Sequence, residues 1–194
     1  MKDLKRYCVF DTETTGLPVA SILGLEKQPE IIEYAAVKVE TFLDENDHLQ
    51  ILICDSLEFM CRPKTNALDP KITKITGIKF EDVENKEPFS SHIDELISFH
   101  KDVDFVVAHN VQFDRKMCMF ELERLGLHDS FFGINPTFMC TVEATFHLKN
   151  HRLKLSELYE MVTGLPPEKS HRAMGDVNTL VECFKWILRE EIPL

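Results

Sequence analysis

Four acidic residues stand at positions where their neighbours predict burial. Asp11 and Glu13 are two residues apart at the end of an apolar run, so along a strand they point to the same face. Asp114 and Asp176 each lie at helical spacing from apolar neighbours, within the stripe that faces a core. An unpaired buried carboxylate either destabilises the fold or takes up a proton. These four side chains therefore need a positive partner.

Two kinds of partner are open to these acids. Each acid taken alone is expected to pair with a nearby Lys or Arg, or to lie at the edge of its stripe. Acids on three separate segments are better explained by one shared divalent cation. Oxygen ligands without a cluster of Cys or His favour Mg²⁺ or Mn²⁺ over zinc.

His171 stands five residues before Asp176, in a loop that contains Pro and Ser. A lone histidine in a loop is usually exposed or structural. Beside a carboxylate metal site it becomes a candidate general base, because the pKa of imidazole is near neutral.

The segments that must position these residues follow from apolar periodicity. Strands come first along the chain, and strands then alternate with helices, which indicates a mixed α/β sheet flanked by helices. Residues 16–29 contain two glycines and two prolines and are expected to form a loop, with an ordered flap as the alternative. Strands are expected at residues 7–11, 31–42, within 51–62, 105–108 and 138–140, and helices at about 68–77, 89–99, 111–125, 142–148, 153–162 and 173–189.

Composition narrows the class of protein. The chain has 194 residues, the usual size of one domain, and we expect a single domain over residues 1–194. No apolar run is long enough to span a bilayer and no signal peptide is evident, so a cytoplasmic protein without membrane contact is expected. The six cysteines have no metal-site spacing and are expected to be reduced. The net charge of −11 argues against a broad basic surface, and no basic tail or arginine-rich stripe is evident.

Three sequence motifs carry a resemblance to a known family. VFDTETTG at residues 9–16 resembles the first motif of the DnaQ-like, or DEDDh, 3′→5′ exonucleases. VAHNVQFD at residues 107–114 resembles the second motif, and HRAMGD at residues 171–176 resembles the third. The motifs occur in the family's order, and the similarity runs from residue 7 to about residue 185.

The resemblance implies a fold and a set of roles. The fold would be RNase H-like, with a mixed five-stranded sheet and helices on both faces. The resemblance also implies two Mg²⁺ or Mn²⁺ ions in the active site and a general base at His171. The implied metal ligands are Asp11, Glu13, Asp114 and Asp176, with Asp114 acting partly through water. The residues implied to hold the 3′-terminal nucleotide are Thr12, Thr14, Gly16, Leu17, Asn110 and Phe113.

The expected reaction is removal of nucleoside 5′-monophosphates from DNA 3′ ends, as in proofreading or repair. The favoured partner is single-stranded DNA. The alternatives are an RNA-trimming exonuclease of the same fold and, with less support, a non-catalytic binding module. Association with a polymerase is not supported by any tethering segment, and a free-standing monomer or homodimer is expected.

Two segments depart from the family pattern. Residues 17–29 form a longer connection than the shortest members have. ITGI at residues 75–78 stands where many members carry His before Gly-Ile, so a nucleotide contact is expected to differ.

The role of His171 is testable from the sequence alone. If His171 takes the proton of the attacking water, His171→Ala should lose about 10²–10⁴-fold in turnover while metal binding survives. The wild-type rate should rise with pH through the titration of this histidine and then level off, and the variant should lack that limb. A variant with normal turnover, or one that loses metal binding and keeps its pH profile, would contradict the role.

Overall fold

A five-stranded mixed sheet forms the centre of the computed structural model, which describes residues 2–127, 131–133, 136–167, 172–190 and 192. The strand order is β3-β2-β1-β4-β5. β1 pairs antiparallel to β2 and parallel to β4, and the outer pairs are β2–β3 antiparallel and β4–β5 parallel. The strands are β1 (Lys2–Thr14), β2 (Ile31–Leu43), β3 (Leu49–Met60), β4 (Phe105–Ala108) and β5 (Thr137–Cys140).

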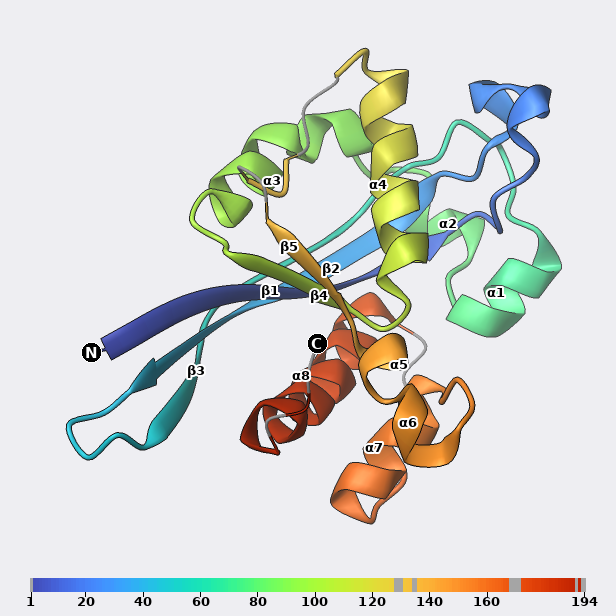
Figure 1. Ribbon diagram of the computed structural model, residues 1–194. Helices are drawn as coiled ribbons and strands as arrows, with labels where there is room; N and C mark the ends of the chain where they lie inside the picture. The colour runs from blue at the N-terminus through green and yellow to red at the C-terminus, as the bar shows by residue number, and fades with distance from the viewer. Residues whose placement is uncertain (1, 128–130, 134–135, 168–171, 191, 193–194) are drawn as a thin grey trace.

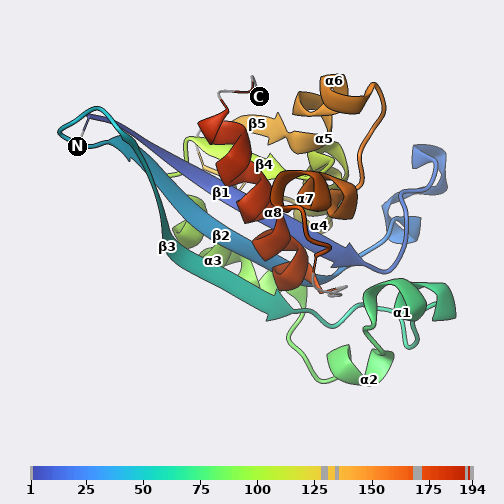
Figure 2. The same ribbon diagram turned by 90° about the horizontal axis from the view of Figure 1, so that it is seen from below.

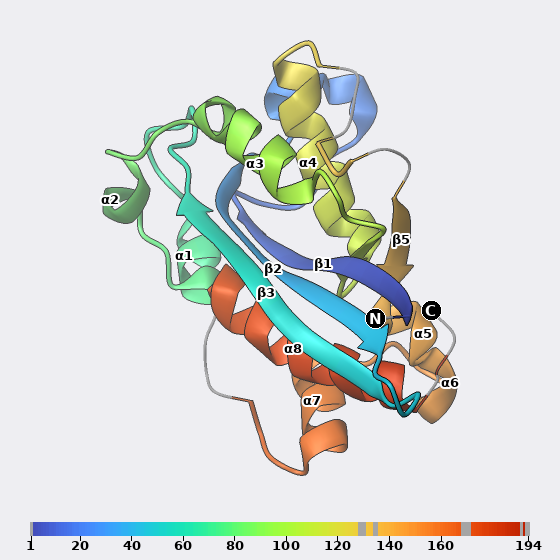
Figure 3. The ribbon, with the colours of Figure 1, turned by 90° about the vertical axis from the view of Figure 1, so that its left-hand side faces the viewer.

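Helices cover both faces of this sheet (Figure 1). Figure 3 shows the sheet with α3 and α4 on one side and α8 on the other, and α7 lies beyond α8. Short 3-10 turns occupy Ser21–Leu23, Leu25–Lys27 and Phe89–His92. The helices are α1 (Pro70–Thr76), α2 (Phe80–Val83), α3 (Ile93–His100), α4 (Val111–Arg124), α5 (Thr141–Ala144), α6 (Phe146–Lys149), α7 (Leu155–Thr163) and α8 (Ala173–Arg189).

The alternation of side chains along β1 divides the core in two. Cys8 and Phe10 belong to the cluster that packs against α3 and α4. Tyr7 and Val9, on the opposite face, belong to the cluster that contains the apolar stripe of α8. The central strand is therefore buried on both faces, and it can hold side chains rigidly at its end.

The expected fold class is confirmed: the sheet has five strands, is mixed, and carries helices on both faces. β1 is longer than expected because its polar first residues pair with the end of β2 while their side chains remain exposed. The single helix expected at residues 142–148 is instead two short helices that meet at Thr145. α2 was not predicted, since a four-residue helix is too short for a clear periodicity.

The cysteines are all free thiols, as expected, and only Cys54 is exposed. Within the described residues, no helix combines the length and the apolar character needed to cross a membrane.

Candidate active site

The end of β1 extends beyond its parallel neighbour. The pairing of β1 with β4 runs from Tyr7 to Val9, whereas β1 continues to Thr14 along β2. In open α/β sheets, ligands bind outside the carboxyl ends of the parallel strands. In Figure 1, α4 lies above β1 and α8 below it, and Figure 2 shows the far end of β1 beyond the start of α8.

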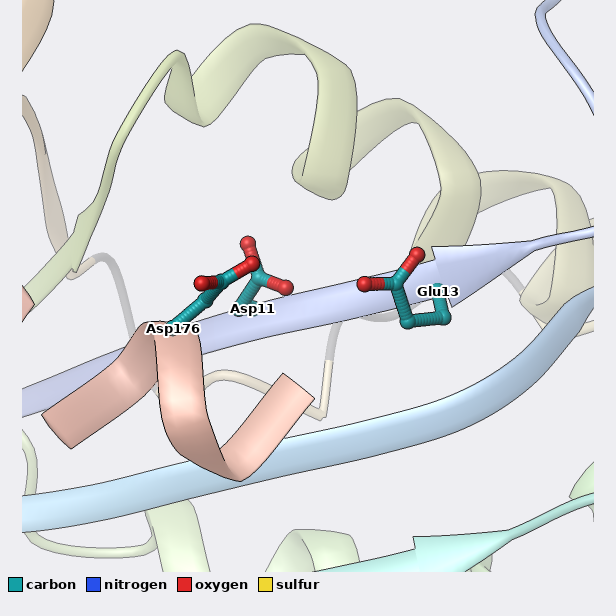
Figure 4. Close-up of side chains that lie close together, drawn as sticks. All are labelled: Asp11, Glu13 and Asp176. Carbon is teal, nitrogen blue, oxygen red and sulfur yellow. The ribbon is translucent and has the colours of Figure 1, made fainter. Parts of the chain in front are cut away.

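Three carboxylates meet at this place. Asp11 and Glu13 come from β1, and Asp176 comes from the first turns of α8, so that one oxygen of each lies within 4.8 Å of the others. Figure 4 shows the carboxylate of Asp176 beside that of Asp11, with Glu13 two residues farther along the strand. The structure thus brings together three of the four acids that the sequence singled out, from segments far apart in the chain.

The fourth acid, Asp114, is buried on α4 and bound to the same stretch of β1. Its Oδ1 accepts hydrogen bonds from the backbone N–H of Thr12 at 3.1 Å and from the Thr12 hydroxyl at 2.8 Å. That N–H lies past the last β1 residue paired with β4, so Asp114 replaces the missing strand partner. Asp114 therefore fixes the backbone between Asp11 and Glu13.

Burial raises the pKa values of these acids, and repulsion between neighbouring carboxylates adds to the effect for Asp11 and Glu13. For Glu13 the pKa rises to about 8, first because of burial and then because of the charges of Asp176, Glu33 and Asp114. Burial likewise raises the pKa of Asp114 to about 7, against the lowering effect of the two Thr12 hydrogen bonds. The pKa of Asp11 is raised well above its usual value, first by burial and then by the charges of Asp114 and Glu13.

A divalent cation would reverse these shifts, because it stabilises the ionised form of each ligand. A set of carboxylate oxygens is also the donor type that Mg²⁺ and Mn²⁺ prefer. The residues of this cluster therefore fit a divalent metal.

A fifth carboxylate, Glu33, was missed by the sequence reasoning. It lies opposite Glu13 in the β1–β2 register and is fully buried. The Arg172 guanidinium forms a forked ion pair with it, with Nε 2.8 Å from Oε1 and 3.1 Å from Oε2. The signal was present, since an acid within the apolar run IIEYAA predicts a buried charge that needs a partner.

The same carboxylate holds the start of α8. Oε2 of Glu33 accepts a hydrogen bond of 2.9 Å from the backbone N–H of Ala173, the first residue of the helix. A carboxylate at a helix N-terminus is favourable because it satisfies a free N–H and interacts with the helix dipole. Glu33 and Arg172 thus attach the start of α8 to β2, three residues before Asp176.

The residues expected to hold a nucleotide fall into two groups. The hydroxyls of Thr12 and Thr14 are buried and committed to Asp114 and to the carbonyl of Gly16. Leu17, by contrast, is 76% exposed and projects from the loop that follows β1.

Two further members of this set lie at the start of α4. Asn110 has a left-handed backbone conformation with φ of 75°, and Phe113 is half-buried against the core. Non-glycine residues in this conformation often mark functional positions. The structure thus leaves Leu17 and the start of α4 open to a ligand, whereas the two threonines support the backbone.

The loop expected at residues 16–29 is ordered by specific contacts. The Arg124 guanidinium donates to the carbonyls of Gln28 at 2.8 Å and Pro29 at 2.9 Å. The Gln28 amide in turn bonds to both the N–H and the C=O of Val19 at 3.1 Å. The loop is therefore a fixed extension of the β1 end.

His171, the expected general base, lies outside the described residues, as do residues 168–170. The described chain resumes at Arg172, which is fixed to Glu33.

The comparison with known protein families identifies this chain. The sequence profile named exonuclease matches residues 8–184, which include the acids described above. The chain belongs to the exonuclease family. The membership expected from the three motifs is thereby confirmed.

The sequence relatives of this chain are much longer proteins, and the similarity covers only a segment of each. It is 30% identical over 171 residues to DNA polymerase III PolC-type of Listeria innocua, covering 88% of this chain and 10% of that protein. It is 28% identical over 192 residues to the 3′-5′ exonuclease DinG of Bacillus subtilis, covering 96% of this chain and 18% of that protein. The chain therefore spans less than a fifth of the length of these relatives.

Solved structures share the fold. The nuclease domain of 3′hExo, described as a DEDDh family member bound to rAMP, matches with a TM-score of 0.74 at 15% identity over 99% of this chain and 96% of that one. Exonuclease X in complex with 5′ overhanging duplex DNA matches with a TM-score of 0.61 at 20% identity over 95% of this chain and 93% of that one.

The raised pKa values predict an unusual pH dependence of stability. The folded protein binds protons at Glu13 and Asp114 that the unfolded chain releases at lower pH, so the metal-free protein should become more stable as the pH falls from about 8 to about 6.5. Melting temperatures in EDTA should show this rise. Glu13→Gln should raise the melting temperature near pH 8 and should make the melting temperature depend less steeply on pH. A melting temperature in EDTA that is constant or falls over this range would contradict the electrostatic account.

The pair of Glu33 and Arg172 gives a second prediction. Arg172→Ala leaves a buried carboxylate without its cation and should cost about 1–3 kcal/mol of unfolding free energy, a value reduced because Arg172 is half-exposed. Arg172→Lys keeps the positive charge but not the two-pronged hydrogen bonding of the guanidinium. Its unfolding free energy should lie between those of the wild type and Arg172→Ala. Chemical denaturation measures both, and equal stability of all three proteins would show that the pair does not hold α8.

Proposed function

We propose that this chain is a metal-dependent 3′→5′ exonuclease that removes nucleoside 5′-monophosphates from DNA 3′ ends. The observation that carries the proposal is the meeting of Asp11, Glu13 and Asp176 within 4.8 Å, in a chain that belongs to the exonuclease family. Hydrolysis of a phosphodiester places negative charge on the attacking and leaving oxygens. A half-buried set of carboxylates meets that need by holding cations.

The proposal gives each acid a function. Asp11, Glu13 and Asp176 would hold two Mg²⁺ or Mn²⁺ ions, and Asp114 positions Asp11 through Thr12 and would act partly through water. When bound, such a pair of ions supplies an activated water and neutralises charge on the leaving oxygen. Four carboxylates and two divalent ions have no net charge, which permits a phosphodiester to approach in a chain of net charge −11.

The remaining residues hold the substrate and move the proton. Leu17 and Phe113 contact the terminal nucleotide, and Asn110 contacts it at the start of α4. His171 accepts the proton of the attacking water.

The relatives favour DNA over RNA as substrate. One of the sequence relatives is a DNA polymerase, and the solved structure of Exonuclease X is a complex with 5′ overhanging duplex DNA. An RNA-trimming activity is the second candidate, because the 3′hExo nuclease domain binds rAMP. The two differ only in how the 2′-OH is sensed.

The test is digestion of one sequence, labelled at its 5′ end, as single-stranded DNA, as duplex DNA and as RNA. With Mg²⁺ or Mn²⁺ we expect products shortened one nucleotide at a time from the 3′ end of the DNA, and none in excess EDTA. Ca²⁺ should support little turnover, because its larger and looser coordination places reactants poorly.

Asp11→Asn and Asp176→Asn provide the matched controls. Each should lose nearly all turnover while remaining folded, and Mg²⁺ should raise their melting temperatures less than that of the wild type. Hydrolysis that survives in excess chelator, or equal Mg²⁺ effects in all three proteins, would refute the metal role of these acids.

A further inference from the structure

One short segment of this acidic chain is locally basic. Residues 144–156 contain no Asp or Glu, whereas they include Lys149, Arg152 and Lys154 together with two histidines. This segment comprises α6 and the connection from α6 to α7. Figures 1 and 2 show the connection on the side of the molecule towards which β1 points.

The backbone of this segment is fixed. Leu153 is buried and packs with Leu158 and Cys183 between α7 and α8. The ring of His109 lies between Leu153 and Thr141, with Nε2 donating to the Leu153 carbonyl at 3.0 Å. Its Nδ1, at 3.0 Å, then accepts from the Thr141 hydroxyl.

Side-chain contacts connect this segment to the candidate active site. Arg152 Nη2 donates to Oδ1 of Asn110 at 3.0 Å, and Asn110 precedes α4 directly. Asp114 lies one helical turn farther along α4 and binds Thr12 between the β1 acids. The basic segment therefore borders the start of α4, where the proposed function places the terminal nucleotide.

The two lysines of the segment are available to a ligand. Both side chains are exposed, and neither forms an ion pair with any residue in the described part of the chain. The two positive charges stand on a fixed backbone in a segment without Asp or Glu. Glu157, just beyond the segment, accepts a hydrogen bond of 2.8 Å from the Lys154 backbone N–H, which helps to fix the start of α7.

We propose that Lys149 and Lys154, with Arg152 between them, bind the phosphates of the nucleic-acid strand on the 5′ side of its terminal nucleotide. The inference rests on the proposed function, because it takes the strand end to lie in the β1 site. Phosphate is the ligand that matches exposed, unpaired lysines, and such contacts hold a strand without reading its sequence. The segment then compensates locally for the net charge of −11, which disfavours binding of a polyanion.

The test compares Lys149→Gln/Lys154→Gln with the wild type in steady-state hydrolysis of (dT)₁₂ over a range of salt concentrations. Loss of two phosphate contacts should raise KM on the order of tenfold at low salt, and by more than kcat falls. The slope of log KM against log salt should decrease by about 1.4, since each contact to a single strand contributes about 0.7. The increase in KM should be smaller for a dinucleotide, because its one phosphodiester is the bond that is cleaved and no upstream phosphate remains for the lysines. Arg152 is kept in this variant, because its replacement would also remove the hydrogen bond to Asn110 and so disturb the start of α4.

Two matched variants complete the design. Lys149→Arg/Lys154→Arg keeps both charges and should keep the wild-type salt slope. Lys5→Gln/Lys101→Gln removes the same charge from exposed lysines at the start of β1 and after α3, and should leave KM and slope unchanged. An unchanged salt slope in Lys149→Gln/Lys154→Gln, or an equal loss in the Lys5 and Lys101 variant, would overturn the proposal.

Failure of the proposed function gives a different result. In that case the wild type hydrolyses none of the substrates. The basic segment is then tested by fluorescence anisotropy of labelled (dT)₁₂, which the wild type should bind more tightly than Lys149→Gln/Lys154→Gln. Equal affinities would refute the segment's role by itself.

Discussion

Repulsion among clustered carboxylates, one buried and three half-buried, is the interaction on which the rest of this structure depends. Burial raises the pKa values of Asp11, Glu13 and Asp114, and for Asp11 and Glu13 the charges of the neighbouring acids, Asp176 included, raise them further. In a flexible chain, carboxylates that repel one another would move apart. They are held together here because two of them share one face of a strand buried on both sides, and the others lie on helices packed against opposite faces of the sheet.

Two sets of contacts stabilise ionised carboxylates without filling the site. Arg172 pairs with Glu33, so the fifth carboxylate is neutralised by a cation of the chain itself. Thr12 donates two hydrogen bonds to Asp114, which lower the pKa that burial raises. The remaining charge on Asp11 and Glu13 faces the open end of β1, where a divalent cation is the fitting partner. The fold thus assigns one carboxylate to structure and leaves the others for a metal.

The charge distribution has a consequence for how a polyanion reaches this site. A net charge of −11 repels nucleic acid at long range, and salt screens this repulsion only partly at contact. Attraction must then come from short range, from cations in the site and from basic side chains beside it. The segment from α6 to α7 carries three such side chains and is attached to the start of α4 through Arg152 and Asn110.

The sequence by itself determined the fold class and the identity of the acids. The period of two in β1 placed Asp11 and Glu13 on one face, and the helical period placed Asp114 and Asp176 in buried stripes, because these relations involve neighbours in the chain. The strand at Phe105–Ala108 and the helix at Ala173–Arg189 were likewise predicted at their observed bounds, since their apolar patterns are long or unbroken.

Only the tertiary structure decided which side chains meet. The bond of Asp114 to the Thr12 N–H depends on β1 outlasting β4, and the pair of Glu33 with Arg172 joins residues 139 positions apart. The same holds for Arg152, whose bond to Asn110 joins the basic segment to the start of α4, and for Leu153, which is buried and accepts a hydrogen bond from the ring of His109. Periodicity describes local neighbours, whereas these contacts depend on register, strand length and packing between distant segments.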